Sequence, residues 1–340
     1  MVSKALRTTL IANKQLVCDR SAAGRVRHVH GDLHLANIAL IDGRAAPFDC
    51  LEFDAELATI DTLYDLAFLI MDLWQRDLRA EANAVFNRYL DISAEDEGGI
   101  ALMPLFLACR AVVRSHVSAA QAQNRDAEPA MAAVARRYLR LAFEMLHSPP
   151  PVLVATGGLS GSGKTSLARQ IAPWLGRAPG ARIARSDVLR KRLAGISPET
   201  RLPASAYTCE ASAAVYAEMT HRAGASLDAG QAAIADAVFA TSEEREMIAH
   251  IGKDHSVPFL GLWLDCAEDQ RVQRVDARSG DASDADASVA RAQSSYPLPP
   301  PGEWVTVNAN TSKEEVFTTA SAYLRERQIL SENSGNTNDV

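Results

Sequence analysis

The stretch Gly158-Leu-Ser-Gly-Ser-Gly163-Lys164-Thr165 decides the fold of the second half of this 340-residue chain. It fits the pattern G-x-x-x-x-G-K-[ST] at every required position. A short apolar run, VLVAT at 152–156, comes before it, and a segment of helical character at 165–175 follows it directly. Strand, glycine-rich turn and helix in this order predict a loop whose backbone N–H groups face a phosphate group.

The residues of this loop have separate expected roles in binding ATP and Mg²⁺. Glycines let the backbone curl around a phosphate, Lys164 reaches the β- and γ-phosphate oxygens, and the Thr165 hydroxyl ligates Mg²⁺. The residues expected to bind the nucleotide are Gly158, Ser160, Gly161, Ser162, Gly163, Lys164, Thr165, Ser166 and, further along the chain, Arg274.

Three consecutive prolines at 149–151 separate this half from the first, because prolines remove backbone donors and interrupt helices. Beyond them, apolar runs recur at 182–186, 232–236, 257–264 and 304–308, with helical segments at 187–194, 209–228 and 242–251. Helix starts are marked by Thr241-x-x-Glu244 and Ser312-x-x-Glu315. Alternating strands and helices predict an α/β domain at 148–330 with a parallel sheet flanked by helices.

The first half, 1–147, is predicted to be mainly helical. Residues 62–74 place Leu63, Leu66, Ala67, Ile70, Met71 and Trp74 on one helical face. Segments 101–120 and 129–146 predict two further amphipathic helices. The polar tail at 331–340 predicts disorder.

Two polar residues follow the second apolar run, in Ser186-Asp187-x-x-Arg190. Strand ends of a parallel sheet open onto the crevice beside the phosphate loop. Asp187 there can accept a proton from a substrate hydroxyl, and Arg190 can hold a substrate anion. The alternative is that Asp187 only caps the next helix.

Asp236 ends the third apolar run, where it can hold Mg²⁺ through water or contact the acceptor; the alternative is an Asp that caps a loop. Arg271, Arg274 and Arg278 follow the fourth run at spacings that put them on one helical face. The Gly- and Asp-rich segment behind them predicts a lid, with Arg278 positioned to stabilise transition-state charge. The alternative is a solvated helix face.

Residues 151–325 resemble the small P-loop kinases that include the 5′-kinase domain of phage T4 polynucleotide kinase, gluconate kinase and the zeta-toxin sugar kinases. The resemblance implies that Asp187 is the general base. It also implies that Asp236 and the pair Glu244-Arg245 match the family's third-strand motif, and that Arg274 and Arg278 match its lid arginines.

A second motif, His30-Gly-Asp32-Leu-His-Leu-Ala-Asn37, lies in the first half. It resembles the catalytic loop of aminoglycoside phosphotransferases, in which the Asp accepts the substrate proton and the Asn holds Mg²⁺. Asp49, in Pro-Phe-Asp49-Cys, matches the second metal-binding Asp, and Tyr64-Asp65-Leu-Ala resembles the supporting helix.

Only 29 residues come before His30, and they predict one helix and a turn instead of an ATP-binding lobe. We therefore expect Asp32, Asn37 and Asp49 to be a vestigial site in a kinase-like C-lobe fragment. Met1 falls within the expected helix, which suggests an N-terminally shortened chain. The order of the two halves resembles bacterial bifunctional aminoglycoside phosphotransferase and ATP-binding proteins.

Composition narrows the cellular setting. The net charge of −7 disfavours non-specific nucleic-acid binding, which needs a basic surface. Five scattered cysteines indicate reduced thiols. No apolar run approaches the roughly 18–20 residues of a membrane span, and no signal peptide is evident. These features predict a cytoplasmic protein without a membrane partner; its oligomeric state stays open.

The leading hypothesis is an ATP- and Mg²⁺-dependent kinase for a small hydroxylated acceptor, in which Asp187, Lys164 and Arg278 carry the chemistry. A regulatory ATP-binding module that hydrolyses slowly without an acceptor is the alternative. Two further hypotheses are antibiotic phosphorylation by the first half and 5′-phosphorylation of nucleic acid; the missing lobe and the acidic charge argue against them.

Overall fold

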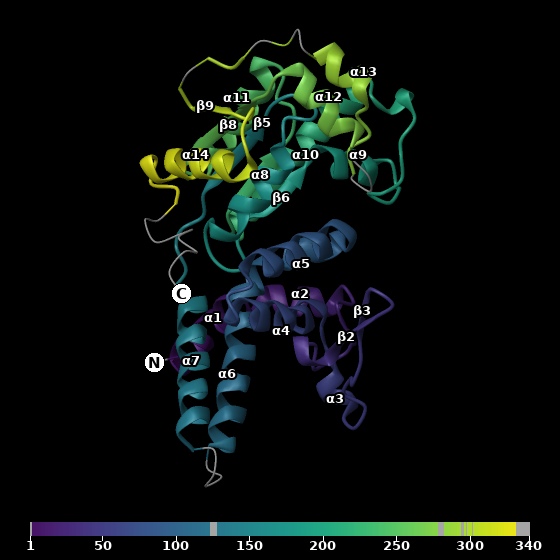
Figure 1. Cartoon of the computed structure of the whole chain (residues 1–340). Helices are drawn as coiled ribbons and strands as arrows, with labels where there is room; N and C mark the ends of the chain where they lie inside the picture. The colour runs from purple at the N-terminus through teal and green to yellow at the C-terminus, as the bar shows by residue number, and fades with distance from the viewer. Residues whose placement is uncertain are drawn as a thin grey trace. The chain divides into compact units, whose positions relative to one another are not determined.

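The computed structural model describes residues 2–122, 128–277, 282–293, 296, 298–300 and 302–330. The chain divides into two compact units (Figure 1). The first comprises Met1–Pro149 with Arg177–Pro179, and the second Pro150–Gly176 with Gly180–Val340. The predicted disordered tail at 331–340 lies outside the described residues.

A parallel sheet forms the centre of the second unit. Its described strands are β5 (Leu153–Gly157), β6 (Arg182–Arg185), β7 (Ala233–Asp236), β8 (Phe259–Asp265) and β9 (Trp304–Asn308). They lie in the order β6-β7-β5-β8-β9, and every neighbouring pair is parallel. Each lies within about two residues of a predicted apolar run, so the predicted α/β fold is confirmed.

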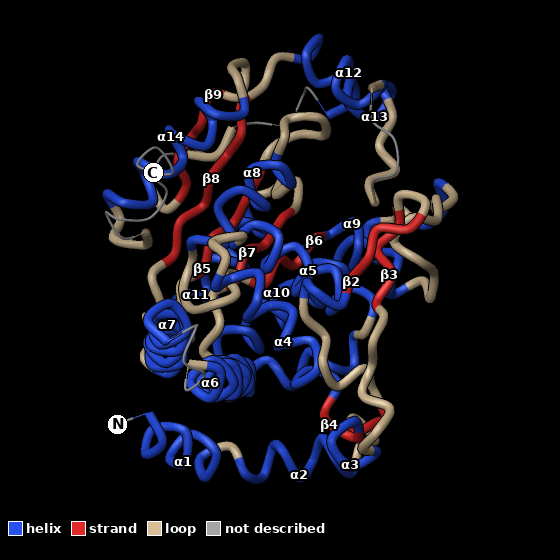
Figure 2. The backbone as a smooth tube through the Cα atoms, turned by 60° about the horizontal axis from the view of Figure 1, so that its bottom comes forward, coloured by secondary structure: helices blue, strands red, loops and turns tan. Residues whose placement is uncertain are grey.

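Helices cover both faces of this sheet (Figure 2). They are α8 (Lys164–Ile171), α9 (Ser186–Leu193), α10 (Cys209–Asp228), α11 (Ser242–Asp254) and α14 (Lys313–Glu326). The shorter elements are η3 (Ala172–Trp174), η4 (Ala204–Ala206), α12 (Glu268–Asp276) and α13 (Ala287–Ala292). Both predicted capping boxes are present, at the start of α11 and of α14.

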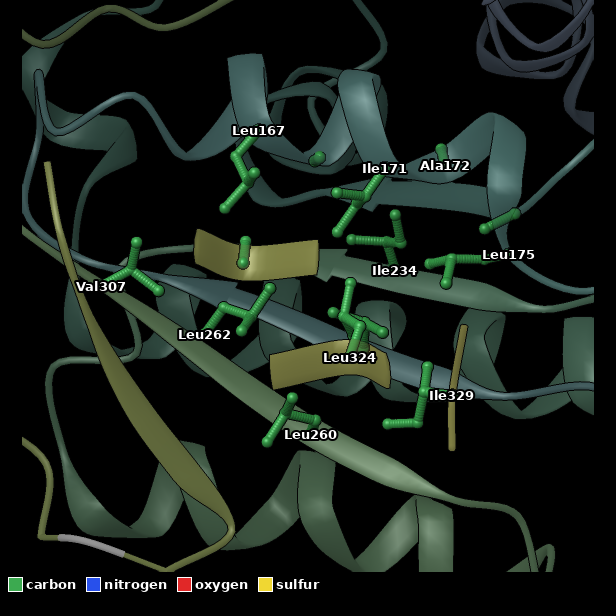
Figure 3. Packing of buried hydrophobic residues seen from close by; sticks show 14 of the residues in the cluster. Leu167, Ile171, Ala172, Leu175, Ile234, Leu260, Leu262, Val307, Leu324 and Ile329 are labelled. Atoms are coloured by element: carbon green, nitrogen blue, oxygen red, sulfur yellow. The ribbon is translucent and has the colours of Figure 1, made fainter. Parts of the chain in front are cut away.

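Two layers of buried side chains hold the helices on the sheet. In one, Leu167 and Ile171 of α8 and Leu324 of α14 pack over Ile234 and Leu262 of the strands (Figure 3). In the other, α10 and α11 cover the opposite face. Because a buried Leu or Ile contributes about 1.5–3 kcal/mol, these layers fix the strand ends from which the site is built.

The first unit is mainly helical, as predicted. Its helices are α1 (Val2–Ala12), α2 (Lys14–Ala22), α3 (Ala55–Ala58), α4 (Thr62–Gln75), α5 (Arg79–Ile92), α6 (Met103–Gln121) and α7 (Glu128–Leu146), with η1 (Leu35–Asn37) and η2 (Ala94–Leu102). Strands β1 (Val26–His28) and β4 (Thr59–Asp61) pair with each other, as do β2 (Ile38–Ile41) and β3 (Arg44–Pro47). On α4 the predicted face is buried, except that Trp74 is half-buried.

The expectation of one helix and a turn before His30 is wrong. Two helices and strand β1 occupy this segment. Asn13 separates the helices with a non-helical φ of −106° and ψ of 11°, and its Nδ2 donates to the Thr9 carbonyl over 2.9 Å. A side chain that bonds nearby backbone competes with helix continuation, which explains the break.

A buried polar cluster ties the N-terminal helices to α4. The Arg20 guanidinium donates to Asp61 at 2.7 and 2.8 Å and to Asp96 at 2.8 Å. Tyr89 donates its hydroxyl to Asp96 over 2.7 Å, and burial together with this bond raises the pKa of Tyr89 to about 12. Buried charges of this kind are stable only when paired.

Within the described residues, one helical stretch, Ala94–Gln121, is long and apolar enough to cross a membrane by length and composition. Fifty-six per cent of its most apolar window is buried inside the protein, and core helices of soluble proteins pass the same test. Its buried side chains include Leu105, Phe106 and Leu107, so it supplies core to the first unit.

Candidate functional site

The loop between β5 and α8 is held in a shape that only glycine permits. Gly158, Gly161 and Gly163 have φ values of 134°, 86° and 101°. A Cβ on Gly158 would lie 2.7 Å from the Leu264 carbonyl oxygen, and one on Gly161 would collide with the Arg271 carbonyl. Positive φ and close backbone approach explain why the pattern requires glycines here.

The interior of this loop suits an anionic oxygen. Helix α8 begins at Lys164, so its unbonded N–H groups and positive end face the loop. The Ser162 hydroxyl is buried without a hydrogen-bond partner among the described residues. Lys164 Nζ donates to the Leu159 carbonyl over 3.1 Å, which keeps the amine at the loop. These donors fit the phosphates of a nucleotide.

Asp236 lies where three strand ends meet. Thr156 of β5 and Arg185 of β6 are its register partners on either side. Its Oδ2 accepts a 2.6 Å hydrogen bond from the Thr165 hydroxyl and lies 3.7 Å from Arg185 Nε; its Oδ1 accepts from Thr156 at 3.3 Å. None of these contacts caps a loop, and the role of Asp236 in holding Mg²⁺ or contacting the acceptor stays a prediction.

The oxygens of Thr165 and Asp236 are the kind of donor that Mg²⁺ prefers. The described residues contain no group of three or more His, Cys, Asp or Glu side chains arranged to hold a metal. A Mg²⁺ ion at this point would therefore depend on these two side chains, water and phosphate oxygens. Few protein ligands and several waters are usual for Mg²⁺ bound with a nucleotide.

Asp187 lies in the first turn of α9, where it interacts with the charges of Lys164 and Asp236. Burial raises its pKa, the charges of Arg185 and Lys164 oppose the rise, and Asp236 adds to it. Helix α9 has no side-chain cap at its N-terminus, so the capping alternative for Asp187 is not supported. The structure thus brings Asp187, Lys164 and Asp236 together.

The predicted substrate residue Arg190 lies one turn after Asp187 on α9, and its guanidinium contacts residues 206–212. Its Nη1 donates to the Ala206 carbonyl over 3.0 Å, its Nη2 donates to Ser212 Oγ over 3.2 Å, and its guanidinium lies 4.8 Å from the centre of the Tyr207 ring. Its role in holding an acceptor anion stays a prediction.

Of the three arginines predicted to lie by a lid, Arg271 and Arg274 fall within the described residues. Arg271 is buried, donating to the carbonyls of Cys266 and Ala290, so the solvated-face alternative fails for it. Arg274 donates to Ala309 O at 3.0 Å and Ser162 O at 3.4 Å, which places it against the backbone of the phosphate loop. Arg278 lies outside the described residues.

Sequence reasoning missed three contacts at the site. Arg185 is at the strand end nearest Asp236, yet inside an apolar run it gave no sign of a role. Gln293 accepts a 2.7 Å hydrogen bond from the Ser160 N–H of the phosphate loop. Asp284 bonds residues some 80–90 positions away. Only the Asp-rich composition near 284 hinted at the last contact.

In the first unit the second motif also forms one loop. Asn37 Nδ2 donates to the carbonyl and the carboxylate of Asp32, at 3.0 and 3.1 Å. Hairpin β2–β3 returns the chain so that the Phe48 N–H donates to the Asn37 carbonyl. This brings Asp49, with φ of 58°, beside the loop. The Asp65 carboxylate accepts from the Gly31 N–H at 2.9 Å and supports the turn.

Much of the second unit matches a protein-family model. Residues 153–300 match a model of the AAA domain (AAA_33). Proteins of Mycobacterium tuberculosis and Mycobacterium bovis, each bearing the name uncharacterized protein, are 31% identical over 281 residues. The match covers 82% of this chain, and the chain spans about half the length (55%) of these curated relatives.

Solved structures similar to the chain include three kinases. A sugar kinase from Janibacter is 19% identical with a TM-score of 0.41, covering 54% of this chain and 99% of the kinase. A gluconokinase from Sinorhizobium meliloti is 21% identical with a TM-score of 0.38, covering 52% and 93%. An APS kinase of M. tuberculosis, in complex with AMPPNP and APS, is 20% identical with a TM-score of 0.38, covering 52% and 97%.

The strand order, the glycine-dependent loop and the family match agree for the second unit. That unit is a P-loop domain in which helices flank a parallel sheet. Its phosphate loop, its Thr165–Asp236 pair and its Asp187 carboxylate lie together at the carboxyl edge of the sheet.

Proposed function

We propose that the second unit is an ATP-dependent phosphotransferase that moves the γ-phosphoryl group to a hydroxyl group of a small acceptor. The observation that carries the proposal is the position of Asp187 in the first turn of α9, where the charges of Lys164 and Asp236 act on it. A carboxylate at that point has no role in holding phosphates, which it would repel. It suits removal of a proton from an incoming hydroxyl.

The chain's own residues divide the work. The loop N–H groups and Lys164 hold the β- and γ-phosphates, so that the γ-phosphorus faces the acceptor side. Asp187 accepts the hydroxyl proton as the acceptor oxygen approaches. Arg185 and, in this proposal, Arg278 offset negative charge, while Arg274 steadies the loop through Ser162. Arg190 orients an acidic group of the acceptor.

Thr165 and Asp236 would hold Mg²⁺, because their oxygens already lie within hydrogen-bond distance at the loop. A bound Mg²⁺ neutralises part of the phosphate charge. In its absence the Thr165–Asp236 hydrogen bond keeps both side chains aimed at the same point.

The raised pKa of Asp187 favours this role. A general base works best when its pKa lies near the working pH, since a more basic carboxylate takes the proton more readily. Burial supplies the rise, and the positive charges of Arg185 and Lys164 oppose it.

For the first unit we propose a C-lobe resembling that of aminoglycoside phosphotransferases, with Asp32, Asn37 and Asp49 in the positions of its catalytic loop and second metal-binding Asp. The hydrogen bonds of Asn37 to Asp32 and the return of the β2–β3 hairpin support this proposal. All five cysteines are free thiols, in keeping with a cytoplasmic setting.

The test is ATP consumption by the full chain with Mg²⁺ across sugars, nucleosides, aminoglycosides and 5′-hydroxyl oligonucleotides. We expect one class of acceptor to raise turnover, and both Lys164→Ala and Asp187→Ala to abolish that increase. Asp32→Ala serves as the matched control in the first unit and should leave it unchanged. Turnover that no acceptor stimulates and Asp187→Ala leaves intact would support a regulatory NTPase instead.

A further inference from the structure

One peptide unit of the phosphate loop is held at both of its polar ends. The Leu159 carbonyl accepts a 3.1 Å hydrogen bond from Lys164 Nζ, and the Ser160 N–H of the same peptide donates to Gln293 Oε1 over 2.7 Å. In a trans peptide these two groups point in opposite directions, so Lys164 and Gln293 contact it from opposite sides. Gln293 thus takes part in the hydrogen bonding of the loop, although it lies 133 positions beyond Ser160.

The backbone that carries Gln293 is fixed against the loop. Helix α13 ends one residue before Gln293, and the buried Arg271 donates from Nη1 to the Ala290 carbonyl of that helix over 2.6 Å. The same nitrogen lies 3.5 Å from the Ser160 carbonyl oxygen. Arg271 therefore ties α13 and the phosphate loop to each other, next to the bond that Gln293 makes.

The start of the segment 282–293 is anchored as well. Asp284 accepts hydrogen bonds from Lys191 Nζ and the Leu202 N–H, each at 3.0 Å, and from the Tyr207 hydroxyl at 2.7 Å. Because both parts of the segment are bonded to the rest of the second unit, Gln293 reaches Ser160 from a fixed support. A side chain that is already in place costs less conformational entropy to use.

The two hydrogen bonds on this peptide strengthen each other. An acceptor at the N–H polarises the peptide and makes its carbonyl a better acceptor, so the bond from Gln293 favours the bond to Lys164. It also restrains rotation of the peptide. An ammonium group carries three N–H donors, and Lys164 can keep its bond to Leu159 while it donates to phosphate oxygens. The orientation of the peptide therefore sets the direction of the Lys164 amine.

We propose that Gln293 is a positioning residue for phosphoryl transfer: its amide oxygen fixes the Leu159–Ser160 peptide, and the carbonyl of that peptide directs the Lys164 ammonium group to the β- and γ-phosphates. The inference rests on the proposed function and adds a residue to it. Without Gln293 the Ser160 N–H would turn to water and the peptide would rotate. A displacement of about 1 Å at a reacting group lowers a rate by as much as about 10²-fold.

The experiment compares kcat and the KM for ATP in full-chain variants, with Mg²⁺ and the acceptor that raises turnover. Gln293→Met keeps the length of the side chain and removes the amide oxygen, so kcat should fall, by as much as about 10²-fold. Gln293→Glu keeps an oxygen for the Ser160 N–H. It should retain most of kcat, while its negative charge raises the KM for ATP. Gln273→Met, at an exposed position of α12, is the matched control and should change neither constant.

An unchanged kcat in Gln293→Met, or an equal loss in Gln293→Met and Gln293→Glu, overturns the inference. Urea unfolding should give the same midpoint for Gln293→Met and Gln273→Met; a lower midpoint for Gln293→Met would mean that Gln293 only stabilises the fold, which also overturns it. If Lys164-dependent ATP turnover occurs but no acceptor stimulates it, the proposed function fails, and the same comparison of kcat on hydrolysis decides the role of Gln293. Absence of any Lys164-dependent turnover rejects both.

Discussion

The Thr165 hydroxyl donates a 2.6 Å hydrogen bond to Asp236, joining the first turn of α8 to the end of β7. The two residues are 71 positions apart in the chain. Their meeting places a hydroxyl oxygen and a carboxylate oxygen at the mouth of the phosphate loop. This pair is the basis for expecting nucleotide binding to depend on Mg²⁺.

Asp236→Asn should uncouple ATP affinity from Mg²⁺. Replacing the carboxylate removes the charged oxygen donor, and metal affinity should fall about 10–100-fold, as for other residues that support a bound metal. Calorimetric titration with ATP, in Mg²⁺ and in EDTA, measures the effect. Asp265→Asn, at the exposed end of β8, is the control. A variant whose ATP affinity still responds to EDTA like that of the unaltered chain would refute the metal role of Asp236.

Asp187→Asn should lower kcat for the acceptor by about 10²–10⁴-fold while ATP affinity changes little. The amide cannot accept the hydroxyl proton, yet it keeps the shape of the side chain. In the unaltered chain the acidic limb of the kcat/KM profile should lie above the usual aspartate range, because burial raises the pKa of Asp187. A pH–rate series measures this limb; a limb at the ordinary aspartate pKa would exclude Asp187 as the base.

The same carboxylate should cost stability at higher pH. Because the folded-state pKa of Asp187 is raised, the folded protein binds more protons than the unfolded chain, and stability falls as pH rises from about 3.9 through the raised value. Asp187→Asn has no carboxyl group to ionise, so it does not lose this stability. The free energy of unfolding of the variant minus that of the unaltered chain should therefore increase as pH rises through that window. Urea unfolding of both proteins at a series of pH values measures this difference in unfolding free energy. A difference that decreases as pH rises would contradict the prediction.

Gly161→Ala should destabilise the second unit and abolish ATP binding. The new Cβ collides with the Arg271 carbonyl and also suffers positive-φ strain. Gly195 has φ of +70° and open space around its Cβ position, so Gly195→Ala isolates the strain, about 1–2 kcal/mol. We expect Gly161→Ala to cost about 1–3 kcal/mol more by overpacking. Equal decreases in the free energy of unfolding of Gly161→Ala and Gly195→Ala would mean that the added Cβ does not collide with the Arg271 carbonyl.

Arg20→Met should destabilise the first unit by about 3–5 kcal/mol, because it leaves the buried Asp96 and the partly buried Asp61 without their cationic partner. Arg25→Ala breaks a pair with the exposed Glu95 and should cost about 0–1 kcal/mol. Hydrogen exchange of peptides from α2 and α4 measures both changes locally. Similar protection in the two variants would show that the buried cluster adds no stability.

Much of the fold was predictable from local patterns. The strands of the second unit are short apolar runs, and the caps at Thr241 and Ser312 depend on residues three positions apart. The start of the chain was not, because a single Asn that bonds its own helix divides α1 from α2. Periodicity carries no information about such a local competition.

The site was predictable in its phosphate loop and only partly elsewhere. Asp187 and Asp236 were predicted because strand ends of a parallel sheet face one crevice. The contacts of Asp284 and Gln293 join segments far apart in sequence, and no spacing rule predicts them. Arg185 was missed because its run resembled an ordinary buried strand.

The most direct test of phosphoryl transfer by the second unit is the fate of the γ-phosphoryl group in ¹⁸O-labelled water, with the acceptor that stimulates turnover. Mass spectrometry of the products distinguishes transfer to the acceptor from hydrolysis. Our account predicts a phosphorylated acceptor without ¹⁸O in its phosphate, and its loss in Asp187→Asn. Release of all the phosphate as ¹⁸O-labelled inorganic phosphate, with or without acceptor, would contradict it.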